Sequence, residues 1–390
     1  MSHPQIPTAQ PLPADDAVSL AARAGLLPRS AWRRARRSAS GARKQAQRWA
    51  KRARYVLRRV QDRSKSSYFR LRDSERGRTF LEAVDTLRAW RERQTRRQAA
   101  APYVARFTGM AIHPDRGYGL LSLDPTGDFA TALAASRRLF ELRLREVEAR
   151  LAGFDSWSPE KQEKFRSQKQ SFLRYLLDDD DLRRHPELVD VGLGDALLGP
   201  ATRYLGMVPL FTRLDLMYSL PRGIDGNIAS QLFHLDHEGL RQVKCFVHLF
   251  DVGEAEGPFT FIPADASARI IREIHRLRRD RGQRQDVEAR RYLDEEVAEV
   301  GGAEAIIRIQ GPTGTGVAVD TSRCLHLGSR VRPGAFRLCL YLQYCTTREV
   351  TNVFDVERYR ADPVRHLAVA HSVEPGRAMA SHYTQRMTAV

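Results

Sequence analysis

QLFHLDHEGL, residues 231–240, places two histidines, an aspartate and a glutamate within five positions, at the end of a strand-like stretch. Along a strand, residues i and i+2 point to the same side. His234 and Asp236 therefore face one side together, whereas Leu235 faces the other. We expect this pair to supply two ligands of a metal ion, provided that another strand brings a third. Otherwise the same residues form only the polar end of a strand.

The third ligand is expected to be His326, in the later stretch GVAVDTSRCLHLGS at residues 316–329. Two histidines and one carboxylate on one face leave coordination positions open for substrate and O2, which is the ligand set of non-heme Fe(II) oxygenases. Such enzymes need an electron donor, and 2-oxoglutarate is one that carries a second carboxylate for the protein to hold. The ordinary alternative is that His326 is a core histidine.

Arg337 enters the apolar strand FRLCLYLQY, residues 336–344, soon after His326. A charge in a buried strand needs an anion beside it, and the guanidinium fork grips both oxygens of a carboxylate. Arg337 is therefore the candidate for holding the far carboxylate of 2-oxoglutarate. Lys244, on another apolar strand, and Gln343, on the same side of the strand as Arg337, are further candidate contacts of an anionic group.

The order of elements around these residues predicts an α+β protein. Helical patterns occupy most of residues 79–205, and from about Leu210 short segments rich in Val, Phe, Leu and Tyr follow one another between Gly and Pro. Helices followed by a run of short strands favour a β-barrel or jelly roll flanked by helices. One charged helical insertion, residues 265–300, interrupts the strands, and we expect it to form a lid or wall over the metal.

Four stretches, in this order, resemble the phytanoyl-CoA dioxygenase-like family of Fe(II)- and 2-oxoglutarate-dependent oxygenases. The stretches are DRGYGLLSLDPTGDFATALAASRRLFEL (115–142), SQLFHLDHEGLRQVKCFVHLFDVGEAEGPFTFIP (230–263), GPTGTGVAVDTSRCLHLGS (311–329) and AFRLCLYLQY (335–344). The resemblance spans roughly residues 100 to 350. It implies a double-stranded β-helix fold of the cupin-like kind, with His234, Asp236 and His326 as iron ligands. It also implies that Arg337 is the arginine that holds 2-oxoglutarate.

The chain departs from the family pattern in two loops. Where the family often has Gly-Ser-His, beside the substrate, this chain has Ala264, Asp265 and Ala266. A hydroxyl residue two positions after the last histidine often helps to hold 2-oxoglutarate, but here that position is Gly328. Ser329 follows one position later, so it is a further candidate contact of the co-substrate.

The resemblance implies hydroxylation of an organic substrate, with O2 consumed and succinate and CO2 released. Asp236 agrees with this outcome, because relatives that halogenate have a small residue at that position. The loops that would select the substrate carry no motif, so a small metabolite, a lipid and a glycan intermediate all remain open. The alternative is a non-catalytic binding or scaffold protein on a degenerate oxygenase fold, acting through its basic N-terminal arm.

The basic arm, residues 17–78, holds 20 Lys and Arg against three acids, which accounts for the whole net charge of +17. The rest of the chain holds 44 basic and 44 acidic side chains. From Trp32 to Val60, small and apolar residues recur at alternating spacings of three and four, as along one face of a helix. The predicted division of the chain is a disordered start at 1–16, a basic helical arm at 17–98, an oxygenase domain at 99–350 and a C-terminal tail at 351–390.

The binding partner of the arm is open on sequence alone. A basic amphipathic helix with tryptophans suits an anionic membrane surface, whereas nucleic acid is supported by charge only, and the chain's own body or a partner helix is a further docking surface. The sequence has no run of 18 apolar residues and no secretory signal. Its four cysteines form no CxxC pair, as expected for free thiols in a reducing compartment. We expect a cytoplasmic protein, which would be peripheral to the inner membrane surface if the arm binds anionic lipid.

A chain that begins at Thr79 is expected to keep succinate turnover on a soluble substrate and to lose sedimentation with anionic vesicles, because the arm carries the entire excess charge. Each Lys or Arg near an anionic surface contributes about 1 kcal/mol. The attraction should fade at 1 M salt, where the Debye length is about 3 Å. If the truncated chain sediments as well as the full chain, the arm is not the anchor.

Overall fold

The computed structural model describes residues 77, 79–82, 84, 89–222, 226–283, 290–347 and 352–373. Apart from residue 77, these belong to one compact unit that begins at Thr79. Almost all of the predicted basic arm, and the whole of the start predicted to be disordered, lie outside the described residues. Within the described part, no helix combines the length and the apolar character needed to cross a bilayer.

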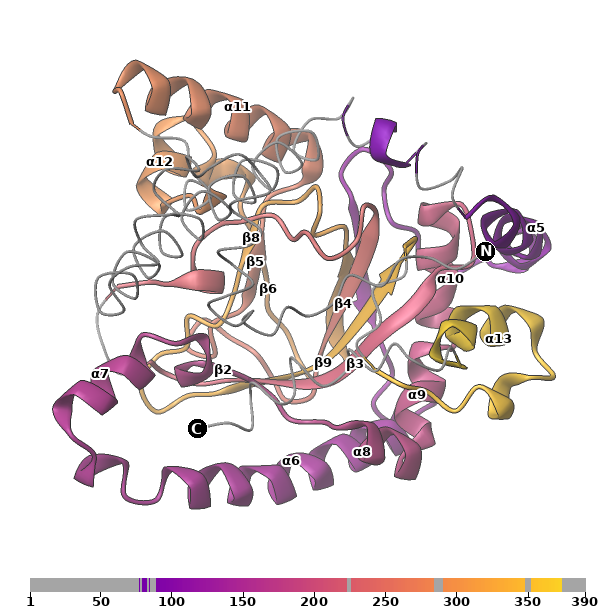
Figure 1. The fold of residues 1–390 in the computed structure, drawn as a ribbon, viewed down its shortest axis with the longest axis horizontal. Coiled ribbons are helices and arrows are strands. Elements are labelled where there is room, and N and C mark those ends of the chain that lie inside the picture. Colours follow the sequence, from indigo (N-terminus) through magenta and orange to yellow (C-terminus); the bar gives the residue numbers. More distant parts are fainter. Residues whose placement is uncertain are drawn as a thin grey trace, which may run out of the picture. The chain divides into compact units, whose positions relative to one another are not determined.

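A six-stranded antiparallel sheet lies at the centre of this unit (Figure 1). In spatial order its strands are β1 (Tyr118–Ser122), β7 (Thr315–Val319), β4 (Gln242–His248), β9 (Arg337–Cys345), β3 (Leu210–Ser219) and β2 (Leu173–Tyr175). Every residue of β9 is buried. This burial explains why β9 is a nearly continuous apolar run in the sequence, since both faces of the strand are covered.

A second antiparallel sheet faces the first. Its strands, in spatial order, are β6 (Ile307–Ile309), β5 (Phe259–Phe261) and β8 (His326–Leu327). Phe246 of β4 stacks on Phe259 of β5 with ring centroids 4.2 Å apart, so the inner faces of the two sheets meet. From β3 and β4 in the large sheet the chain passes to β5 and β6 in the small sheet, returns to β7, and then passes through β8 to β9. The α+β class predicted from the sequence is confirmed, and this winding agrees with the predicted double-stranded β-helix.

Helices cover the outer face of the large sheet (Figure 1). They are α5 (Trp90–Arg106), α6 (Ala130–Leu151), α8 (Asp179–Arg184), α9 (Pro186–Gly192), α10 (Asp195–Leu205) and α13 (Pro363–Val369). A further helix, α7 (Pro159–Arg166), follows α6 and is capped by Ser158. Short 3₁₀ turns occur at Phe154–Ser156, Lys169–Ser171, Ala229–Gln231, Ala303–Ala305, Glu357–Tyr359 and Ala370–Val373.

The packing of the structure bears on two of the three predicted domain boundaries. The boundary between residues 98 and 99 falls inside α5, where the buried Arg96 donates to the carbonyl oxygens of Val208 (3.3 Å) and Thr346 (2.7 Å). The helix therefore belongs to the body of the protein. Residues 352–373, predicted as part of a C-terminal tail, also belong to the body, because Phe354 and Val369 are buried in the main core.

The predicted helical insertion is present as α11 (Ala264–Asp280) and α12 (Asp294–Glu299). Ile270 and Ile274 of α11 pack with Phe233 and Leu325 on the outer face of the small sheet. The two helices are joined by the buried Arg278, whose guanidinium binds both carboxylate oxygens of Glu296 at 2.6 Å. The residues that replace the family's Gly-Ser-His form the first turn of α11.

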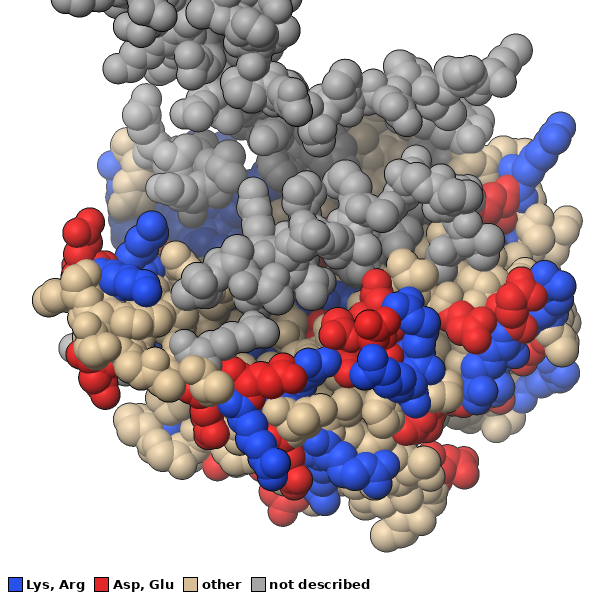
Figure 2. Space-filling model, turned by 60° about the horizontal axis from the view of Figure 1, so that its bottom comes forward, with Lys and Arg blue, Asp and Glu red and all other residues tan. Residues whose placement is uncertain are grey.

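The described surface of the body carries mixed charge. Figure 2 shows acidic and basic side chains interspersed over the face that it draws. This distribution agrees with the equal numbers of acids and bases outside the arm. All four cysteines are buried and unpaired, as predicted.

Leu340→Ala is expected to lower the free energy of unfolding by about 2–5 kcal/mol, because it opens a cavity between β9 and the covering helices. Leu340 is fully buried, whereas Leu120 on the edge strand β1 is 61% exposed. Leu120→Ala is the matched control and should change stability by no more than about 0.5 kcal/mol. Urea unfolding of both variants measures the difference, and equal losses would contradict this packing.

Candidate metal centre

The structure brings His234, Asp236 and His326 together at one end of the small sheet. His234 and His326 form an antiparallel bridge, with N–H to O distances of 3.0 Å in both directions. The Asp236 N–H donates to the carbonyl of Thr321 at 2.9 Å, which anchors the turn after His234. One ligand atom from each of the three side chains lies within 4.8 Å of the others. Segments at least 90 residues apart in the chain therefore converge on one point.

The two imidazoles are oriented so that their Nε2 atoms are available to a metal. His234 Nδ1 lies 2.8 Å from the carbonyl oxygen of Leu232, and His326 Nδ1 lies 3.0 Å from that of Cys324. A carbonyl only accepts, so each Nδ1 carries a hydrogen, and Nε2 is the nitrogen of each ring that can bind a metal. Burial, and then the neighbouring His326, hold the pKa of His234 well below its usual value. The neutral, metal-binding form of His234 is therefore favoured.

The carboxylate of Asp236 is kept ionised by its surroundings. Burial alone would raise its pKa, but the charge of Lys244, followed by the interactions with His326 and His234, lowers the pKa well below its usual value. Its oxygens lie 3.1 Å from Nε2 of His326 and 3.6 Å from Nε2 of His234. Two imidazole nitrogens and one anionic oxygen, all converging, fit a divalent transition metal with coordination positions left open.

Lys244 lies at this centre and not beside Arg337. Its Nζ donates to Asp236 at 2.7 Å and to Glu238 at 3.2 Å. These two carboxylates, acting against the effect of burial, raise the pKa of Lys244 well above its usual value. Lys244 is thus a positively charged support for a metal ligand, a role that differs from the predicted contact with 2-oxoglutarate.

Arg337 is a buried cation without an acidic partner among the described residues. It is 1% exposed, and Nη1 donates to the carbonyl of Gly257 at 2.5 Å. Nη2 lies 3.4 Å from the hydroxyl of Ser219 and 3.5 Å from that of Ser329, while Nε has no hydrogen-bond partner. Burial lowers the pKa of Arg337, because no anion offsets the loss of solvation. An isolated buried guanidinium is costly, so this site fits a carboxylate supplied by a ligand.

Two hydroxyls complete the neighbourhood of Arg337. Ser329, proposed from the sequence, adopts a positive φ of 63° and its Oγ lies 2.8 Å from Oγ of Ser219. Ser219 was not found by sequence reasoning. The signal that identifies it is the register of β3 with β9, which pairs Ser219 with Arg337. A Cβ at position 328 would lie 3.3 Å from Nη2 of Arg337, so the absence of a side chain at Gly328 leaves room beside the guanidinium.

Gln343 is separated from Arg337 by the length of β9. Six residues of strand span about 20 Å, and Gln343 pairs instead with Lys244 and Arg213 on the neighbouring strands. Its side chain contacts the hydroxyl of Tyr341 at 3.1 Å. Gln343, a candidate contact of an anionic group, therefore lies at the Lys244 end of the sheet and not beside Arg337.

Comparison with known proteins gives structural likeness only. No family model and no curated protein matches this chain. The chain is similar to the non-heme alpha ketoglutarate dependent epimerase SnoN from nogalamycin biosynthesis (17% identity, TM-score 0.39, 64% of this chain and 83% of that one). It is also similar to EctD from S. alaskensis with bound Fe (18%, 0.38, 65% and 81%) and to HygX from Streptomyces hygroscopicus with nickel and 2-oxoglutarate bound (14%, 0.34, 60% and 85%). At TM-scores below 0.5 the likeness carries no argument about this chain, whose chemistry rests on its own side chains.

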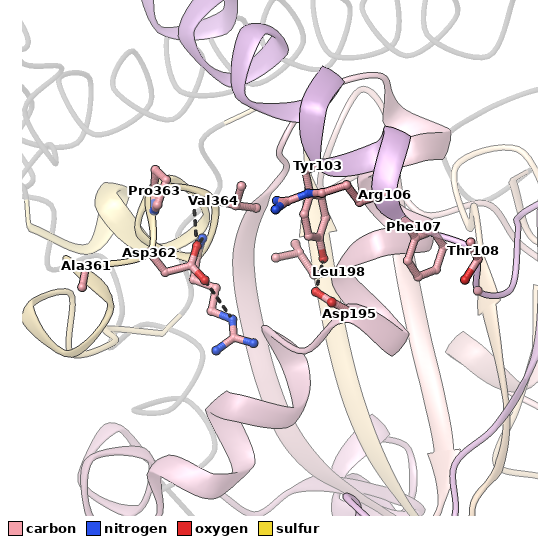
Figure 3. Close-up of a pocket in the computed structure, with 12 residues that line it drawn as sticks. Tyr103, Arg106, Phe107, Thr108, Asp195, Leu198, Ala361, Asp362, Pro363 and Val364 are labelled. Carbon is pink, nitrogen blue, oxygen red and sulfur yellow. Dashed lines mark hydrogen bonds and ion pairs between the residues drawn. The ribbon is translucent and has the colours of Figure 1, made fainter.

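A cavity of about 790 Å³ lies elsewhere, among α5, α10 and α13 (Figure 3). None of the metal-centre residues lines it. Two pairs of its polar side chains already contact each other: Tyr103 donates to Asp195 at 2.7 Å, and Arg365 lies 3.5 Å from Asp362. We regard it as a gap between packed helices and place the chemistry at the metal centre.

Proposed function

We propose that this protein is an Fe(II)- and 2-oxoglutarate-dependent oxygenase that hydroxylates an organic substrate, on a jelly-roll core like that of the phytanoyl-CoA dioxygenase-like family. The observation that carries the proposal is the pairing of two features. The His234, Asp236 and His326 side chains each offer a ligand atom within 4.8 Å of the others. The buried Arg337, which lies against Gly328 just after His326, has no acidic partner among the described residues. The metal site alone fits several enzymes, but this combination is what iron and 2-oxoglutarate together require.

Each of these residues has a distinct role in the proposal. His234, Asp236 and His326 would hold the ferrous ion, which when bound supplies the activation of O2 coupled to oxidation of 2-oxoglutarate to succinate and CO2. Arg337 would bind the far carboxylate of 2-oxoglutarate, with the Ser219 and Ser329 hydroxyls as further donors. The aromatic inner faces of the two sheets, where Phe246 meets Phe259, would exclude water from the co-substrate.

The experiment is an assay of the full chain with Fe(II), 2-oxoglutarate and O2, challenged with pools of small metabolites, lipids and glycan intermediates. Succinate formed and O2 consumed should rise together when a pool contains the substrate. Omission of iron or O2 should stop both. Stoichiometric iron binding without measurable affinity for 2-oxoglutarate would contradict the proposal and favour the non-catalytic scaffold.

A further inference from the structure

Within the helical insertion, the residues just before α12 run beside the metal centre. Tyr292 and Phe233 form an antiparallel bridge, with N–H to O distances of 2.9 and 3.2 Å. In this register the next opposed pair is Arg291 and His234. The guanidinium of Arg278 also donates to the backbone carbonyl of Arg291 at 2.8 Å, so this segment is held from both sides.

The pleat decides the direction of the Arg291 side chain. Directly opposed residues of neighbouring strands point to the same side of a sheet, and successive residues alternate. Phe233 and Tyr292 point outward into the core beneath α11, together with Leu325 and Leu327. The alternating residues His234 and His326 point inward to the metal centre. Arg291, opposed to His234, therefore belongs to the inward set.

Arg291 has unused hydrogen-bonding capacity at this place. Its Nη1 is buried and has no hydrogen-bond partner among the described residues. Burial lowers the pKa of Arg291, although the charges of Asp236 and Glu238 act in the opposite direction. Both of these carboxylates already accept from Lys244, and Asp236 is also the anionic metal ligand in the proposed enzyme.

The charges at the centre also favour a further anion. Asp236 and Glu238 are negative, while Lys244, Arg291 and Arg337 are positive, so these five side chains carry a net charge of +1. A ferrous ion and the doubly negative 2-oxoglutarate cancel each other. One positive charge thus remains when metal and co-substrate are both bound. Arg291 is a cation at this place whose Nη1 has no hydrogen-bond partner among the described residues.

We propose that Arg291 binds an anionic group of the substrate, a carboxylate or a phosphate, and so fixes the carbon to be oxidised over the metal. This inference rests on the proposed function and narrows the substrate to anionic molecules. In this proposal the segment between α11 and α12 supplies a side chain that binds the substrate. A planar fork suits such oxygens better than an ammonium group does.

The test uses the full chain loaded with Co(II) and saturated with 2-oxoglutarate, titrated with inorganic phosphate. The readout is the visible absorption spectrum of the metal, so that phosphate bound by the basic arm does not register. The wild type should show a saturable spectral change. Arg291→Gln should move its midpoint to roughly tenfold or more higher phosphate, since a hydrogen bond to a charged group is lost, and Arg291→Lys should lie between the two.

Arg272→Gln is the matched control, because it removes the same charge from an exposed position of α11; its midpoint should equal that of the wild type. Equal midpoints for the wild type and Arg291→Gln, or no saturable change in the wild type, would overturn the proposal. So would a larger effect of Arg291→Gln on the midpoint for 2-oxoglutarate, which would assign Arg291 to the co-substrate. If 2-oxoglutarate itself leaves the wild-type spectrum unchanged, the proposed function fails, and the phosphate titration still decides the role of Arg291.

Discussion

Asp236→Ala is expected to abolish iron binding and substrate-stimulated succinate formation. The substitution removes the anionic ligand of the centre and leaves the two imidazoles. Loss of an outer-shell partner typically lowers metal affinity or activity by about 10–100-fold, so loss of a ligand should exceed about 100-fold. The measurements are iron content after gel filtration and succinate formed per minute in the presence of a stimulating metabolite pool.

The control for Asp236→Ala is Asp280→Ala, which removes an exposed carboxylate from the last turn of α11. It should keep iron content and turnover at wild-type levels. Asp236→Ala also leaves Lys244 with Glu238 as its remaining acidic contact, so the fold of the variant should be checked by circular dichroism. Succinate formation that survives in a folded Asp236→Ala variant would sink the assignment of the metal centre.

Arg337→Ala is expected to raise the KM for 2-oxoglutarate several hundred-fold while iron still binds. Removing one partner of a buried charge pair costs about 3–5 kcal/mol, which corresponds to at least a hundred-fold in affinity. Iron content should persist, because no hydrogen bond or ion pair joins Arg337 to the three metal ligands. Titration of 2-oxoglutarate in the succinate assay measures the effect.

Two companion variants sharpen this result. Arg337→Lys keeps the charge but loses the two-pronged fork, so its KM should lie between those of the wild type and Arg337→Ala. Arg308→Ala removes an exposed arginine from β6 and should leave the KM unchanged. A wild-type KM in Arg337→Ala would mean that another cation holds the carboxylate.

Local patterns suggested parts of the metal centre, and the resemblance to a known family implied the complete ligand set. The i, i+2 spacing of His234 and Asp236 placed both on one side of a strand, and the apolar run around Arg337 marked a charge that would be buried. The same kind of reasoning located the helical insertion at 265–300 and the four free cysteines. These features depend on periodicities of two or 3.6 residues and on the chemistry of single side chains, so they can be read from a short window.

Contacts between distant segments were decided only by the tertiary structure. Ser219 lies beside Arg337 because β3 and β9 pair in a particular register. Arg291 lies beside His234 because the insertion returns to the edge of the small sheet. Lys244 contacts the metal ligand Asp236, although the sequence had suggested a contact with the co-substrate. The boundaries near residues 98 and 351 failed for the same reason. Strand register and helix packing depend on how two remote surfaces fit together, and a slip of one residue would turn every side chain to the opposite face.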